Sequence, residues 1–182
     1  MAVKVSVDNH VLVAGELAIV PVGREARLWV GPTPWAEGTT ESEARETLKA
    51  LARTGITAIV DLNAKAREGE LARELGLEYR PVRVKDDGHP LPPGILKEAV
   101  TVVTDLLQAG HCVYLHCTQG RGRSPTVAAA YLIASEGLTS EDARQRIREL
   151  DRKWPHRGIW SPPFDEHFPA RLKEFEALVR GE

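Results

Sequence analysis

The residues that decide the fold are 113–126, which read VYLHCTQGRGRSPT. An apolar run that suits a buried strand ends at Cys117, and a helical pattern begins near Ser124. Gly120 and Gly122 between them permit positive φ, so successive backbone N–H groups can turn inward. The helix start adds unpaired N–H groups and a partial positive charge. This stretch therefore predicts a cradle for a tetrahedral dianion.

The rest of the chain alternates between strand and helix patterns. Apolar runs predict a hairpin of 3–7 with 11–13 and further strands at 17–22, 27–30, 56–62, 77–84 and 112–115. Helical periodicity, with Thr39 or Thr40 and Ser140 as caps, predicts helices at about 40–54, 64–75, 95–108, 124–136, 140–150 and 164–180. This alternation favours an α/β fold with a central, mostly parallel (mixed) β-sheet flanked by helices.

Composition and charge exclude several classes of protein. The 182 residues include 24 Lys and Arg against 26 Asp and Glu, and the formal net charge of −2 argues against a nucleic-acid or membrane-surface binder. The 2 cysteines are too few for a disulfide framework or a four-cysteine zinc site. Neither a signal-peptide pattern nor a run of about 18 apolar residues is present. We therefore expect a cytoplasmic monomer without a membrane span.

The residue types within 113–126 indicate phosphoryl chemistry. Arg123 offers a planar fork that can bind two phosphate oxygens. The positive surroundings favour the thiolate of Cys117, which would be placed for in-line attack. Ser124 is expected beside the cysteine, where its hydroxyl can donate a hydrogen bond that helps the sulfur leave. His116 is expected to order the loop by hydrogen bonding rather than to act as a base.

The pattern His116-Cys117-x-x-Gly120-x-x-Arg123-Ser124 resembles the signature of the cysteine-dependent protein tyrosine phosphatases. Ser-Pro after the arginine is similar to the dual-specificity branch. The resemblance implies one phosphatase domain over 1–182, with 1–26 as an N-terminal β extension and 27–180 as the catalytic core. It implies hydrolysis through a cysteinyl-phosphate, with no cofactor and no metal. The loop residues expected to hold the substrate phosphate are His116, Thr118, Gln119, Gly120, Arg121 and Gly122.

The same resemblance implies a general acid. The family supplies an aspartate from an upstream loop, and Asp87 stands 30 residues before Cys117. Asp-Gly followed closely by proline resembles the acid loop of the phosphatases of regenerating liver and their cell-cycle relatives. Asp87 is therefore the predicted general acid, with Asp86 as the alternative. The asparagine that dual-specificity phosphatases often carry before their last helix has no counterpart in 159–164.

Two features bear on the substrate without deciding it. Arg121 resembles a basic loop residue of the phosphoinositide 3-phosphatases. The Thr-x-Gly-x-Gly-Arg pattern resembles the loop of the glucan phosphatases. The plainer interpretation of Arg121 is a loop residue that faces solvent. A basic stretch at 152–157, with Trp154 and Trp160, either lines the active-site mouth or packs under a loop.

We expect a phosphorylated tyrosine or threonine of a protein as substrate, with a phosphoinositide, an inositol phosphate or a phosphoglucan as the alternative. A catalytically silent phosphate-binding module and an incidental glycine-rich turn are the remaining interpretations.

Cys112 is predicted to be a small buried hydrophobe rather than a redox partner of Cys117. Five residues of strand span about 16 Å, whereas a disulfide needs Cα atoms within about 7 Å.

Overall fold

A computed structural model describes residues 12–14, 17–22, 27–65, 67–85, 91–152 and 168–182. The described strands form one sheet in the order β1-β2-β3-β6-β4-β5. Neighbouring strands from β3 to β5 run parallel, and β1, β2 and β3 pair antiparallel. The predicted mixed, mostly parallel sheet is confirmed. The strands are β1 Leu12–Ala14, β2 Leu17–Val22, β3 Leu28–Pro32, β4 Ala58–Asp61, β5 Glu78–Pro81 and β6 Val113–Cys117.

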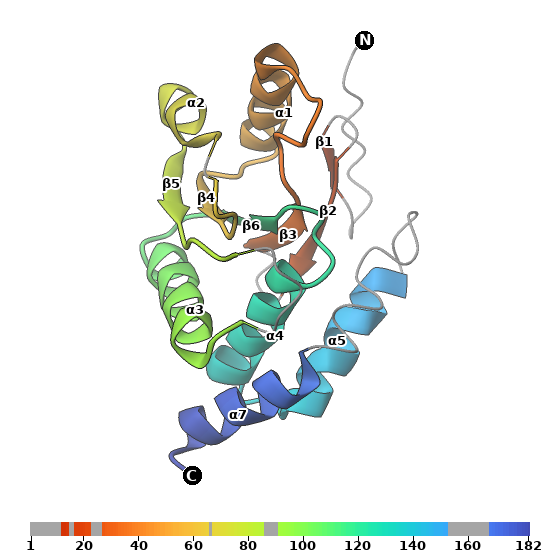
Figure 1. Cartoon of the computed structure of the whole chain (residues 1–182), viewed down its shortest axis with the longest axis vertical. Coiled ribbons are helices and arrows are strands. Elements are labelled where there is room, and N and C mark those ends of the chain that lie inside the picture. The colour runs from red at the N-terminus through yellow and green to blue at the C-terminus, as the bar shows by residue number, and fades with distance from the viewer. Residues whose placement is uncertain (1–11, 15–16, 23–26, 66, 86–90, 153–167) are drawn as a thin grey trace.

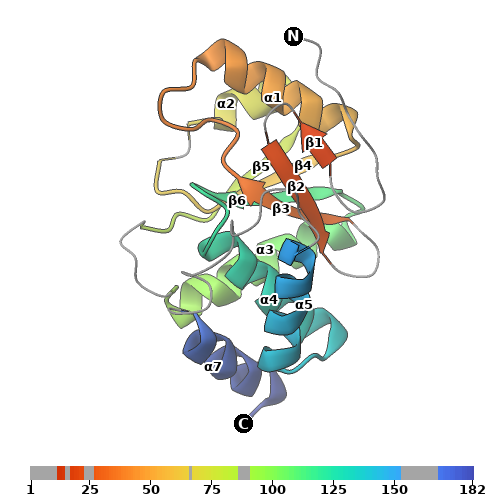
Figure 2. The same cartoon turned by 90° about the vertical axis from the view of Figure 1, so that its right-hand side faces the viewer.

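Helices cover both faces of the sheet. α1 and α2 lie on one face, and α3, α4, α5 and α7 lie on the other (Figures 1 and 2). Side chains alternate between the two faces along a strand, so Val60 and Leu115 join the core under α3 and α4, whereas Ile59 and Tyr114 join the core under α1 and α2. The helices are α1 Glu41–Arg53, α2 Gly69–Glu74, α3 Pro93–Gln108, α4 Arg123–Glu136, α5 Ser140–Arg152 and α7 Pro169–Arg180.

Local signals set the ends of α1 as expected. Thr40 is its N-cap and forms a capping box with Glu43, in which each side chain bonds the other residue's backbone N–H. Gly55, just beyond the helix, has a φ of +95°, which favours glycine.

α4 carries the predicted catalytic loop at its N-terminus and is buried almost all round. Its residues from Arg123 to Ala130 are all buried, because the helix packs against α3, α5 and α7 as well as the sheet. A helix held on so many sides provides a rigid base for the loop that precedes it.

One predicted helix start and one predicted helix cap are wrong. α2 begins at Gly69 rather than near Ala64, because the preceding segment turns Glu68 into the interior. α5 is capped by Thr139 rather than Ser140: the Thr139 hydroxyl accepts from the Asp142 N–H at 3.0 Å, and the Ser140 N–H donates to Glu176 of α7 at 2.8 Å.

Other boundaries differ at the sheet edge. β3 continues to Pro32, beyond the predicted end at Val30, because it follows β6 in register to its last residue. β1 pairs with β2, and the expected hairpin partner at 3–7 lies outside the described residues. Residues 164–167 of the predicted last helix also lie outside them.

Candidate active site

The site lies where the parallel strands end. The register places Pro32 of β3 opposite Cys117 of β6, and Asp61 of β4 opposite His116. All five residues of β6 are buried, and Cys117, its last residue, is 2% exposed. In open α/β sheets, ligands bind outside the carboxyl ends of the strands. Cys117 therefore stands at the sheet edge where a ligand is expected.

The loop between β6 and α4 is held against the end of β3. Gly120 has a φ of +72°, and a Cβ there would lie 2.8 Å from the carbonyl carbon of Gly31. The Thr33 N–H donates to the Thr118 carbonyl at 3.2 Å. Gly122, where positive φ was also anticipated, has a φ of −127° and serves as the N-cap of α4. Only Gly120 among the two loop glycines therefore needs glycine for its backbone conformation.

Ser124 lies beside Cys117, as the sequence indicates. Its Oγ atom is 3.3 Å from the Cys117 Sγ atom, and both residues are buried. Gly122 has no side chain that could accept a hydrogen bond from the first turn of α4, so the helix N-terminus is left for another acceptor. A thiol, a hydroxyl and a helix N-terminus meet at one point, which is an arrangement suited to an anion.

Arg123 is buried and fixed across the ends of the neighbouring strands. Its Nη1 atom donates to the Leu62 carbonyl at 3.0 Å and to the Val84 carbonyl at 3.4 Å. Its Nη2 atom donates to the Thr118 hydroxyl at 2.9 Å, which in turn donates to the Asn63 Oδ1 atom at 2.8 Å. Thr118 thus orients the arginine, while its predicted contact with the substrate phosphate stays a prediction.

A pocket of about 330 Å³ opens beside this loop. Arg123 and Thr118 form the wall on the side of the catalytic loop. Its other lining residues come from the segments that follow β3 and β4, and include Trp35, Lys65 and Arg67 together with the acidic Glu37 and Glu68. The Trp35 ring is held by a hydrogen bond from Nε1 to the Thr39 carbonyl at 3.0 Å. The predicted arginine thus lines the same pocket as an aromatic ring held in place, two further cations and two carboxylates.

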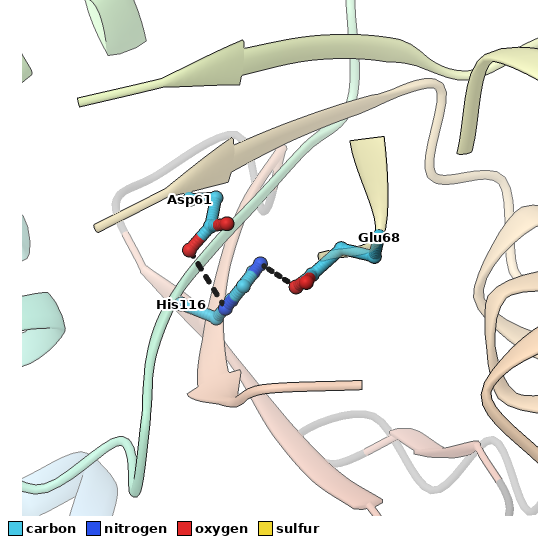
Figure 3. A group of neighbouring side chains, drawn as sticks. All are labelled: Asp61, Glu68 and His116. Atoms are coloured by element: carbon cyan, nitrogen blue, oxygen red, sulfur yellow. Dashed lines mark ion pairs between the residues drawn. The ribbon is translucent and has the colours of Figure 1, made fainter. Parts of the chain in front are cut away.

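His116 lies fully buried between two carboxylates, as Figure 3 shows. Its Nε2 atom is 3.1 Å from Glu68 Oε1, and its Nδ1 atom is 3.7 Å from Asp61 Oδ1. These are ion-pair contacts, since neither nitrogen has an aligned hydrogen-bond acceptor within the described part of the chain. The Tyr114 ring stacks on the imidazole with a centroid distance of 5.5 Å. His116 thus contacts two carboxylates as ion pairs, not through the hydrogen bonds that were expected of it, and its role in ordering the loop stays a prediction.

The carboxylates control the ionisation of His116. Burial alone lowers the pKa of His116, but Glu68, and after it Asp61 and Cys117, raise this pKa above its usual value. For Glu68, burial raises the pKa, but the adjacent His116 lowers it further, to below the usual value. Burial keeps the pKa of Asp61 above its usual value.

Both carboxylates have further partners. The Tyr79 hydroxyl and the Asn63 N–H donate to Asp61, the latter at 2.8 Å. The Thr33 hydroxyl donates to Glu68 at 3.3 Å.

Several predicted site residues are exposed or lie outside the described residues. Gln119 and Arg121 are exposed on the loop. The acid candidates Asp86 and Asp87 lie outside the described residues, as do Trp154, Arg157 and Trp160. Cys112 precedes β6, is half-buried and is a free thiol; burial raises its pKa.

Sequence reasoning missed Asp61, Asn63 and Glu68. One signal was available for Asp61, which is the single charged residue in the predicted buried strand 56–62. Glu68 sits among other charged residues, and nothing in its local sequence marks it for burial.

The fold and the site together define a class of protein: the cysteine-dependent phosphatases with a dual-specificity-like fold. A family model described as "Polymorphic toxin system, DSP-PTPase phosphatase" matches residues 36–137, and the chain belongs to this family.

Similar proteins agree with this assignment. Human dual specificity protein phosphatase 1 is 27% identical over 128 residues, which cover 69% of this chain and 31% of that protein. Dual specificity protein phosphatase PHS1 of Arabidopsis thaliana is 32% identical over 76 residues, or 42% of this chain and 8% of that protein. The chain thus matches less than a third of the length of either relative.

Solved structures share the fold. A structure of PTPMT1 superposes with a TM-score of 0.64 at 21% identity and covers 85% of this chain and 92% of its own. A structure of human DUSP28 gives a TM-score of 0.61 at 22% identity, over 85% of this chain and 94% of its own.

Among the described residues, none of the helices has both the length and the apolar character needed to cross a membrane.

Proposed function

We propose that the chain hydrolyses phosphomonoesters through a cysteinyl-phosphate intermediate, and that its substrate is a phosphorylated tyrosine or threonine of a protein. The observation that carries the proposal is the 3.3 Å contact between Cys117 Sγ and Ser124 Oγ, at the end of a buried strand and the start of α4. A nucleophile in this position faces N–H groups that favour an anion.

In the first step the Cys117 thiolate attacks phosphorus. The S–P bond forms, the bond from phosphorus to the ester oxygen breaks, and Asp87, or Asp86 as the alternative, gives that oxygen a proton. Arg123 and the loop N–H groups bind the equatorial oxygens, where negative charge gathers. Because Arg123 is anchored on the Leu62 carbonyl and Thr118, it needs little reorganisation for this role.

In the second step water attacks phosphorus and the S–P bond breaks. The carboxylate that gave its proton takes one from the water, so inorganic phosphate leaves and the acid is restored. The sulfur departs as a thiolate, and the Ser124 hydroxyl stabilises it by donating a hydrogen bond.

The pocket supports an aromatic phosphoester. Trp35 forms a wall of the pocket that also contains Arg123, and its ring is fixed by the bond to the Thr39 carbonyl. A phenyl ring carrying the phosphate would contact this indole, which favours phosphotyrosine over a smaller alkyl phosphate.

A second candidate substrate is a phosphoinositide, an inositol phosphate or a phosphoglucan. Lys65 and Arg67 line the same pocket, and Arg121 is exposed on the loop, so additional phosphates would meet cations. PTPMT1, a structural relative, has been solved in complex with PI(5)P. Replacing Lys65 and Arg67 by alanine should weaken hydrolysis of such a substrate more than hydrolysis of a simple aryl phosphate.

The proposal also includes the expected extent and compartment of the enzyme. We place the catalytic core at 27–180 of a single domain, with 1–26 as its β extension. A thiolate nucleophile must stay reduced, which favours the cytoplasm.

The test is hydrolysis of 4-nitrophenyl phosphate with a chelator present. Cys117→Ser should abolish turnover, and Cys112→Ser, the matched control on the other thiol, should leave it close to wild type. Activity retained by Cys117→Ser, or lost on chelation, overturns the mechanism. Substrate trapping by Asp87→Ala, screened in parallel against phosphopeptides, phosphoinositides and phosphoglucans, decides the substrate class.

A further inference from the structure

Glu68 and Asp61 face opposite nitrogens of the same imidazole (Figure 3). One ligand atom from each of Asp61, Glu68 and His116 lies within 4.8 Å of the other two, close enough to suggest ligands around a metal ion. The shortest contacts, however, lie on opposite sides of the ring, since Glu68 is 3.1 Å from Nε2 and Asp61 is 3.7 Å from Nδ1. This is the arrangement of a cation between two anions.

The protonated ring suits both contacts. An imidazolium carries a positive charge shared by both nitrogens, so it is attracted to the carboxylates on either side. A neutral ring would turn a lone pair toward one of the two buried carboxylates, and an unpaired charge in the interior is costly. The raised pKa of His116 and the lowered pKa of Glu68 agree with this assignment.

The same carboxylate is linked to the catalytic loop from two sides. His116 immediately precedes Cys117 in β6. Glu68 also accepts from the Thr33 hydroxyl, and the Thr33 N–H holds the Thr118 carbonyl. Glu68 thus contacts a neighbour of the nucleophile and the strand end that anchors the loop.

We propose that Glu68, supported by Asp61, is a positioning residue that keeps His116 as an imidazolium, and that this buried cation orients the catalytic loop and favours the Cys117 thiolate. The part that Glu68 would play in catalysis rests on the proposed function, whereas its effect on Cys117 can be measured without a substrate.

Within the described part of the chain, ionisable groups from several elements surround His116. Asp61 comes from β4, Glu68 from the segment before α2, and Cys117 from β6. Tyr114 of β6 stacks on the ring, and Tyr79 of β5 contributes its hydroxyl through Asp61. Glu68 is the closest of the carboxylates, so its removal should have the largest effect.

The experiment measures alkylation of Cys117 by iodoacetamide from pH 5 to 9 in a Cys112→Ser background, followed by mass spectrometry. In Glu68→Gln we expect the profile to move to higher pH, with a rate at pH 6 about tenfold lower, as one pH unit of displacement implies. Glu68→Asp keeps the charge and should restore much of the rate. Glu70→Gln, an exposed glutamate two residues further, is the matched control and should match wild type.

An alkylation profile unchanged in Glu68→Gln overturns the inference. Because alkylation needs no substrate, wild-type protein that alkylates as expected but hydrolyses nothing refutes the proposed function alone. Should Glu68→Gln fail to fold, the ring nitrogens of His116 in the wild-type chain, observed by ¹⁵N NMR at pH 7, provide the second test. Both nitrogens protonated supports the inference, and a neutral tautomer overturns it.

Discussion

The Cys117 Sγ atom and the Ser124 Oγ atom lie 3.3 Å apart although seven positions separate them in the sequence. The contact exists because β6 ends at the cysteine, Gly120 turns the chain back, and the serine is the second residue of α4. In the proposed mechanism, it places a hydroxyl donor beside the sulfur that accepts negative charge when the cysteinyl-phosphate is hydrolysed.

Ser124→Ala should therefore slow the second chemical step more than the first. Without the donor, the departing thiolate loses a hydrogen bond to a charged group, which corresponds to a decrease in kcat of about ten- to hundredfold. Rapid-mixing kinetics with 4-nitrophenyl phosphate should show a burst of nitrophenol as the cysteinyl-phosphate accumulates. Ser135→Ala, on an exposed turn of the same helix, should show wild-type kinetics. A Ser124→Ala protein with normal kcat and no burst would contradict the role.

Gly120→Ala should destabilise the protein and impair the loop together. Its φ of +72° costs an alanine about 1–2 kcal/mol, and the added Cβ would also meet the Gly31 carbonyl carbon at 2.8 Å. Gly137→Ala is a close control, because φ there is +68° but the Cβ meets open space. Urea denaturation should therefore show a larger loss in free energy of unfolding for Gly120→Ala than for Gly137→Ala, and only the former should lose activity. Equal losses in free energy of unfolding for the two variants would mean that β3 shifts to accommodate the new methyl group at position 120.

The fold was largely predictable because its signals are local. Apolar runs mark strands β4 and β6, and the hydroxyl–glutamate pair at Thr40 and Glu43 marks the start of α1. The cap of α5 was misplaced although Thr139 and Asp142 have the same spacing as that pair. Two adjacent hydroxyl residues compete for one cap, and their tertiary contacts decide: Ser140 binds Glu176 from α7.

The residues of the candidate site also differ in whether their positions could be predicted from local sequence. Cys117, Arg123 and Ser124 are encoded within one short stretch of chain, so motif and geometry agree on their proximity. The link from His116 to Asp61 depends on β4 lying beside β6 in register, which is a property of the sheet order. Glu68 was harder to predict, since periodicity places it inside a helix at about 64–75, whereas in the structure it is the N-cap of a helix that begins at Gly69.

The bracketed imidazole makes stability depend on pH in a defined direction. The pKa of His116 is lowered by burial but raised overall by Glu68 and Asp61. A raised native pKa gives stability that is fully present below the unfolded pKa of about 6.5 and is lost as pH rises through the native pKa. The free energy of unfolding should therefore fall as pH increases from 6 through the native pKa of His116.

Urea denaturation at a series of pH values from 6 to 9 measures this slope. Glu68→Gln should flatten it, because the main group that raises the pKa of His116 is gone. Glu70→Gln should retain the wild-type slope, since that side chain is exposed on α2. Stability that stays constant or increases over this range in the wild-type protein would show that His116 is neutral in the native state.

Trp35 should set the preference between aryl and alkyl phosphates. Its indole lines the pocket with Arg123, and a phenyl ring in contact with it gains about 0.5–1.5 kcal/mol beyond burial. Trp35→Ala should therefore lower kcat/KM for a phosphotyrosine peptide by about two- to tenfold more than for the matched phosphothreonine peptide. Trp35→Phe keeps an aromatic face but loses the hydrogen bond to the Thr39 carbonyl, so its effect should fall between wild type and Trp35→Ala. An equal decrease for both peptides would mean that the indole supports the segment after β3 without contacting the substrate, and the preference for aryl esters would then have to come from another wall of the site.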